Sequence, residues 1–173
     1  MATTLTVPQI SAGIRWTFSQ TQTWGDATSQ SSAFNFNDTL ADGTGADQAN
    51  RLYVLQSTIA GGATLTLDLA ASLTDVFGSS ITFARVKTFY FELTSDTSSS
   101  SVTLGNSGTA PAPLWFGADD QTITIKNGGC FLIHAPGATA YPVTATTADK
   151  LLLTNDDGSN VATIKIVIIG VSV

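Results

Sequence analysis

Apolar and polar residues alternate one by one along several stretches of this chain, and this pattern limits the fold more than any other feature. Residues 14–18, 64–69, 88–93 and 122–126 each carry apolar side chains at every second position. Successive side chains of a β-strand point to opposite faces of a sheet, so the alternation predicts strands with one buried face. A helical turn is expected only at 69–77. The pattern predicts an all-β protein.

Turn signals separate the predicted strands. Asn127-Gly128 lies between strands expected at 122–126 and 130–134, and Asp157-Gly158 lies between 150–155 and 161–173. Asn-Gly and Asp-Gly supply the positive φ angles of tight hairpin turns, so we expect a β-hairpin at each dipeptide. Several short strands with a turn every 8–12 residues are typical of a β-sandwich or barrel. We expect a jelly-roll-like β-sandwich.

The last predicted strand, 161–173, is apolar on both faces. Ile164, Ile166 and Ile168 share one face, and Val167, Ile169 and Val171 lie on the other. A strand that is apolar on both faces is either central in its sheet or covered by a neighbouring subunit.

Residues 19–50 are rich in Gln, Ser, Thr, Asn and Asp, which predicts an extended arm or long loop that a partner orders. Residues 1–50 then form an N-terminal strand and arm, and 51–173 form the β-sandwich of a single structural domain. Trp16 falls on the alternating apolar face of 14–18 and is expected in the core. Trp24 lies in the polar arm and is expected at an intersubunit contact, where Trp is enriched.

The composition disfavours catalysis and nucleic-acid binding. The chain has one His, one Cys, one Glu and four Lys, whereas Thr, Ser and Gly number 27, 17 and 15. Acid–base catalysis most often uses His, so we expect no enzyme and no cofactor. A net charge of −6 with scattered basic residues indicates no nucleic-acid partner. The longest apolar run, 166–169, is too short to span a membrane, and no signal peptide is visible.

No metal site is predicted. His134 and Cys130 share a strand face, but two ligands do not make a zinc site, so a hydrogen-bonded structural His134 and a buried Cys130 are expected. Asp residues, including the pairs 119–120 and 156–157, sit where turns are expected. Calcium binding by these residues, or hydrolysis by Asp119 and Asp120, are weaker alternatives.

Three stretches occur in an order that resembles small virion structural proteins of tailed bacteriophages. They are 40–51 (LADGTGADQANR), 67–78 (LDLAASLTDVFG) with 83–87 (FARVK), and 129–170, which contains YPVTA and DKLL. The likeness covers about residues 40–170 and includes no catalytic motif. It implies a non-enzymatic component of the virion, assembled in the host cytoplasm.

We therefore expect a capsid decoration or auxiliary protein that binds the major capsid protein or other virion proteins. A homo-oligomer is expected, with a trimer as one form. The alternative is a tail-associated module that binds a receptor or glycan through exposed aromatic residues such as Trp24 or Trp115. The candidate interface residues are Trp24, Phe34, Phe36, Val167, Ile169 and Val171.

Overall fold

The computed structural model describes residues 5–6, 8–21, 27–71, 73–95, 99–106 and 121–172. Within these ranges the chain forms strands, turns and bends and no helix, so the expected all-β class is confirmed. The described residues also include no helix that is long and apolar enough to cross a membrane.

The helical turn expected at 69–77 is wrong. A turn at 69–71 leads instead to β7 (Leu73–Thr74), which pairs with β8 (Ser80–Ile81). Oδ1 of Asp75 accepts hydrogen bonds from the N–H groups of Phe77 (2.9 Å) and Ser79 (2.8 Å), which closes a tight loop between the two strands. Asp side chains favour such local bonds over helix continuation.

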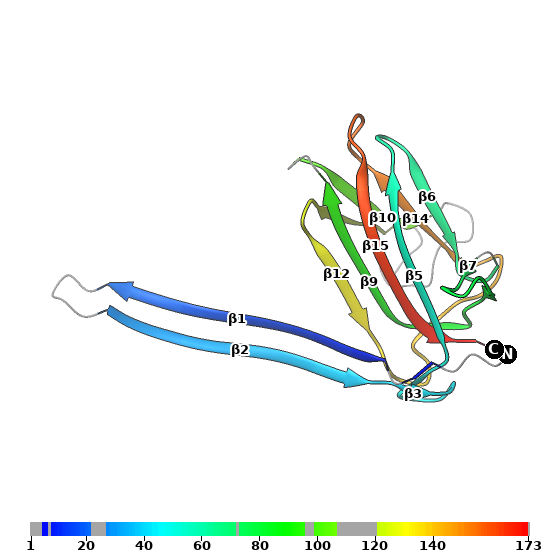
Figure 1. Cartoon of the computed structure of the whole chain (residues 1–173), viewed down its shortest axis with the longest axis horizontal. Helices are drawn as coiled ribbons and strands as arrows, with labels where there is room; N and C mark the ends of the chain where they lie inside the picture. The colour runs from blue at the N-terminus through cyan, green and yellow to red at the C-terminus, as the bar shows by residue number, and fades with distance from the viewer. Residues whose placement is uncertain are drawn as a thin grey trace.

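Two antiparallel sheets make up the body of the molecule (Figure 1). One has the order β11-β10-β14-β6, formed by β6 (Thr64–Asp68), β10 (Ser101–Asn106), β11 (Ile123–Lys126) and β14 (Lys150–Asn155). The other has the order β12-β9-β15-β5, formed by β5 (Arg51–Ile59), β9 (Arg85–Ser95), β12 (Cys130–His134) and β15 (Ala162–Val171). The short β13 (Tyr141–Pro142) also pairs with β9.

One hydrophobic core lies between the two sheets. Its fully buried side chains come from both, among them Phe89, Phe91, Leu93, Ile164, Ile166 and Ile168 from the second sheet and Leu104, Leu151 and Leu153 from the first. The predicted shared faces of 89–93 and 164–168 are therefore confirmed as inward faces. This core fixes the opposite, outward face of each strand, because side chains alternate across the sheet.

The turn predicted at 127–128 exists, whereas Gly158 lies in a bend without a positive φ, and the strands beside either dipeptide do not form a hairpin. The turn at 127–128 joins β11 to β12, and the loop around Asp157 joins β14 to β15; in each case the strands belong to opposite sheets. Gly128 has a φ of +75°, as expected for a tight turn. Its N–H donates to the carbonyl oxygen of Leu93, and Asn127 Oδ1 accepts from the N–H of Ser95. These bonds tie the turn to β9 and direct β12 into the second sheet.

A long two-stranded arm projects from the body on the side of β12 (Figure 1). It consists of β1 (Gln9–Thr21) and β2 (Ala27–Thr39), which pair antiparallel over their whole length. At its base, β3 (Ala41–Asp42) and β4 (Gln48–Ala49) form a small parallel pair. Trp16 lies on this arm with 39% of its surface exposed, so its expected place in the core is wrong. The alternation at 14–18 is that of a strand whose apolar face is left exposed by the described residues of the chain.

Candidate functional site: an apolar arm face and the groove at its base

One face of the arm is mostly apolar and is exposed, with Gln30 and Ser32 among its polar members. The register pairs Ile14 with Phe34 and Ala12 with Phe36, and directly opposed residues share a face. We call the resulting set the arm face: Ile14 (71% exposed), Trp16 (39%), Phe18 (70%), Phe34 (76%) and Phe36 (45%). Trp16 and Phe34 stack, with ring centroids 5.9 Å apart and planes at 27°. The face therefore presents an ordered row of large side chains to the outside.

The opposite face of the arm is polar. It carries Ser11, Arg15, Thr17, Ser19, Ser29, Ser31, Asn35 and Asn37, together with Gly13 and Ala33. Thr17 and Ser31 form a cross-strand hydrogen bond between their hydroxyl groups at 2.9 Å. The arm is thus amphipathic, and only one of its faces is suited to solvent.

A small second core holds the base of the arm against the body. Ile10, on the same ribbon face as the arm face, is buried together with Leu40, Ala49 and Ile169. Ile169 lies on the outward side of β15, so the arm base covers part of the outer face of the sheet β12-β9-β15-β5. The apolar side of the arm and the outer face of this sheet therefore meet at one place.

A polar latch reinforces the same junction. Nε2 of His134 lies 2.7 Å from Oδ2 of Asp38, and Nδ1 of His134 lies 2.8 Å from the hydroxyl oxygen of Thr88. The ring of Phe36 packs at a tilt on the imidazole, with centroids 5.5 Å apart. The hydrogen bond from His134 lowers the pKa of Asp38, and the backbone N–H of Thr39 adds to the effect. The hydrogen-bonded structural role expected for His134 is confirmed.

A groove of about 470 Å³ opens between the arm base and the outer sheet face. Its lining consists of Gln9, Ile10, Ser11, Ala12, Gly13, Thr88, Tyr90, Cys130, Leu132, Val167 and Ile169. None of these residues is Asp, Glu, Lys or Arg, and more of the lining surface is apolar than polar. Beside the groove, Val54 on β5 is 44% exposed and pairs across the sheet with Val167. The outer sheet face thus carries an apolar patch next to the arm.

The structure places the expected interface residues unevenly. Phe34 and Phe36 lie on the exposed arm face, and Val167 is half-buried in the groove. Ile169 and Val171 are buried within the chain itself. Strand β15 lies between β9 and β5 in its sheet. Its two apolar faces are therefore explained by this central position, the first of the two explanations given for the sequence pattern. Trp24 lies outside the described residues, as do Trp115, Asp119 and Asp120.

Cys130 is exposed, so the expectation that it is buried is wrong. It begins β12, which lies at the end of its sheet, and it pairs with Glu92 on the outward face. The apolar sequence around Cys130 belongs to a strand whose inward residues are at 131 and 133, and alternation places 130 outside.

A hydrogen-bonded cluster marks the polar end of the outer sheet face. The hydroxyl of Tyr90 donates to Oε2 of Glu92 at 2.8 Å, and Nζ of Lys165 lies 3.3 Å from Oε1. Burial, followed by the bond to Glu92, raises the pKa of Tyr90 to about 12, so this phenol is no base or nucleophile near neutral pH. The bonds from Tyr90 and Lys165 lower the pKa of Glu92. The hydrogen bonds of this cluster are therefore made among its own members.

Lys87 occupies a site that the sequence pattern does not indicate. Its side chain is fully buried, and Nζ donates to the carbonyl oxygens of Gly45 (2.6 Å), Pro136 (2.7 Å) and Gly137 (3.0 Å). Burial, followed by the nearby charge of Arg85, lowers the pKa of Lys87. Three carbonyl acceptors match the three N–H donors of an ammonium group. Lys87 therefore ties the loop after β3 to the loop after β12.

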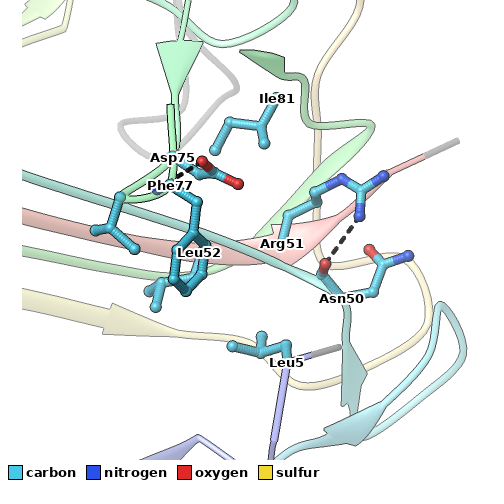
Figure 2. Close-up of a pocket in the computed structure, with 8 residues that line it drawn as sticks. Leu5, Asn50, Arg51, Leu52, Asp75, Phe77 and Ile81 are labelled. Atoms are coloured by element: carbon cyan, nitrogen blue, oxygen red, sulfur yellow. Dashed lines mark hydrogen bonds between the residues drawn. The ribbon is translucent and has the colours of Figure 1, made fainter. Parts of the chain in front are cut away.

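A second hollow lies at the lower end of β5 and is too small for a substrate (Figure 2). It has a volume of about 90 Å³ and is lined by Leu5, Asn50, Arg51, Leu52, Asp75, Val76, Phe77 and Ile81. Ligand pockets are usually about 300–1,000 Å³. Arg51 donates to the carbonyl oxygen of Asn50, and Asp75 is bound to its own loop, so neither side chain is directed at a ligand.

The described aspartates act mainly in turns. Oδ1 of Asp157 accepts from the N–H groups of Ser159 and Asn160, each at 3.0 Å, and these bonds hold the pKa of Asp157 well below its usual range. Oδ2 of Asp149 accepts from the N–H of Thr146 at 2.7 Å. Among the described residues, no group of three His, Cys, Asp or Glu side chains is placed to hold a metal ion.

No protein-family model matches this sequence, and a search of curated proteins gives no match either. The likeness to virion proteins of tailed phages therefore stays a prediction. The arm face and the groove beside it are the features of the molecule that bear on its function.

Proposed function

We propose that this chain is a structural virion protein of a tailed phage, a capsid decoration or auxiliary protein that stabilises the particle through subunit contacts. The observation that carries the proposal is the arm face, where five large apolar side chains project into solvent on a ribbon joined to the body only at its base. Isolated two-stranded ribbons are marginally stable in water, and large apolar patches mark interaction sites. An arm of this kind is suited to assembly.

The strand pairing also supports a jelly roll. If the eight main strands are taken in chain order, the first pairs with the eighth (β5·β15), the second with the seventh (β6·β14), the third with the sixth (β9·β12) and the fourth with the fifth (β10·β11). Successive pairs alternate between the two sheets. We infer that one long antiparallel ribbon is wrapped into a double-layered jelly roll, an architecture that is frequent in viral capsid and lectin domains.

Charge fits a partner made of protein. The net charge of −6 favours a position away from packaged DNA, because nucleic-acid binding relies on clustered Lys and Arg. We propose the major capsid protein or another virion protein as partner, with a homo-oligomer, a trimer included, as the assembling unit. No enzymatic step, cofactor or metal is part of the proposal.

Co-sedimentation with empty capsids of the source phage tests this function. We expect the purified chain to bind shells in a fixed ratio and to raise the temperature at which they disassemble. The matched control is a shell that is already fully decorated, which has no free sites. A chain that ignores shells but binds cell-surface polysaccharide to saturation would move the assignment to a tail-associated glycan-binding module.

A further inference from the structure

The arm face exposes as much apolar surface as the largest patch on a typical monomer. A large side chain buries about 150–250 Å² when it is fully covered. The exposed fractions of the five arm-face side chains therefore leave on the order of 500 Å² of apolar surface on the arm. The largest patch on a typical monomer is about 300–600 Å² and is often functional. The arm alone reaches this size, and the patch on the outer sheet face adds to it.

The chain's own body does not cover the arm face. Ile10 and the Asp38–His134 contact fix the base, and from there the ribbon runs away from the sheet past β12 (Figure 1). Phe18 and Phe34 remain 70% and 76% exposed as a result. At the same time, the groove beside Tyr90, Leu132 and Val167 stays open. The same chain therefore carries an unfilled apolar groove and an uncovered apolar ribbon.

The two surfaces match in chemistry. The described strands of the arm contain two charged residues: Arg15, on the polar face, and Asp38, at the base. The groove lining contains none, and Glu92, which pairs across the sheet with the lining residue Cys130, forms an ion pair with Lys165. Two acidic chains can therefore bring an arm to a groove without placing like charges in contact.

We propose that the arm face binds a second copy of this chain, lying across the outer face of that copy's β12-β9-β15-β5 sheet beside Tyr90, Leu132 and Val167. In a closed dimer or ring, each subunit gives one arm and receives one. Each contact buries about 500 Å² on either side, so two contacts reach the roughly 1,200–2,000 Å² of a stable interface. A single one-way contact falls short, which favours reciprocal exchange between identical chains.

The oligomeric mass of the full chain tests the exchange. We expect a discrete oligomer in sedimentation equilibrium, and association at least about 30-fold weaker for Ile14→Ser/Phe34→Ser, since truncation of a hot-spot residue commonly weakens binding to that extent. The control Thr17→Ser/Asn35→Ser alters the polar face of the same two strands and is expected to associate normally. Circular dichroism and thermal unfolding identify any variant that fails to fold.

Mixing two defective variants separates arm exchange from other contacts. Val167→Lys places a charge in the groove and leaves the arm intact. If Val167→Lys fails to fold, Val54→Lys places a charge beside the groove at a more exposed position. We expect each groove variant alone to be monomeric. A mixture of groove variant and arm variant should form a heterodimer that is weaker than the unmodified oligomer and is seen only at high protein concentration, because its one intact contact has the size of a weak interface. If the groove variants assemble like the unmodified chain while the arm variant does not, the arms pack on each other and the exchange is wrong. A monomeric unmodified chain, or an arm variant with unchanged mass, also overturns it.

This inference deepens the proposed function, on which it rests for the role of the oligomer in the particle. The two can fail separately. The mass without shells tests the arm contact, whereas co-sedimentation with shells tests the virion role. An oligomer that ignores shells refutes the function alone, and a shell-binding monomer refutes the arm exchange alone.

Discussion

Nε2 of His134 lies 2.7 Å from Oδ2 of Asp38, and this contact joins the last strand of the arm to the edge strand of the body. The imidazole is held from its other side by Thr88 and is covered by the ring of Phe36. The single histidine of the chain therefore positions the arm on the body.

Asp38→Asn is expected to destabilise the arm base at neutral pH and to have little effect in acid. The pKa of Asp38 lies below its ordinary value of 3.8 in the folded state, chiefly because of the hydrogen bond from His134. A lowered carboxyl pKa contributes stability that is fully present above about pH 4 and lost as the pH falls through the folded-state pKa. A partly exposed pair of this kind is worth at most about 1 kcal/mol.

Thermal unfolding of both proteins between pH 2 and pH 7 provides the measurement. The difference in the free energy of unfolding should stay constant above about pH 4 and shrink towards zero below it. A difference that does not depend on pH would mean that the Asp38 carboxylate contributes nothing through its charge.

Lys87→Met should be strongly destabilising although the two side chains have similar length. The change removes the charged donor to three carbonyl oxygens, those of Gly45, Pro136 and Gly137. Hydrogen bonds to a charged group contribute about 1.5–3 kcal/mol, so a loss of about 2 kcal/mol or more in urea unfolding is expected.

The matched control for Lys87 is Lys165→Met, which makes the same replacement at a side chain that is 49% exposed. An exposed ion pair such as Lys165–Glu92 contributes little to stability, so we expect a small change. Equal losses at the two positions would contradict the structural role of the carbonyl cage around Lys87.

Alternation predicts the core strands well because burial acts on each residue locally. The inward faces at 89–93 and 164–168 follow directly from period two, and the structure confirms them. The period-two pattern does not predict which strands pair with each other, because the turn at 127–128 is compatible with a hairpin and with a crossing between sheets. The bonds of Asn127 and Gly128 to β9 decide the outcome, and they join residues more than 30 positions apart.

The site is harder to predict than the core for the same reason. An apolar alternating stretch looks the same in a sequence whether its partner is the chain's own sheet or another molecule, so Trp16 is expected in the core and lies on the arm. The role of Lys87 is not predicted, because its three acceptors are backbone carbonyl groups, which no residue type in the sequence identifies. Phe34 and Phe36 are found because apolar residues are rare in that polar segment.

Gly170→Ala tests the irregularity in the central strand. The register between β15 and β9 shifts between Ile169 and Gly170, and a Cβ at Gly170 would collide with the carbonyl oxygen of Arg85. Forcing extra atoms into such a site costs about 1–3 kcal/mol, so the thermal midpoint should fall by several degrees. Gly158→Ala is the control, since a Cβ there meets no atom within 4 Å. If the two variants unfold alike, backbone crowding at Gly170 is not what requires glycine.

Alkylation of Cys130 should report whether the groove is covered. Cys130 is exposed in the single chain and lines the groove, so a second copy's arm lying there would shield its thiol from a maleimide reagent. When nine-tenths of the protein is assembled, the rate should be about tenfold lower than in the Ile14→Ser/Phe34→Ser variant, because only the free fraction reacts. Dilution of the unmodified chain should restore the fast rate, and both proteins should react equally in denaturant. A rate that stays fast in a confirmed oligomer would place the intersubunit contact elsewhere than in the groove.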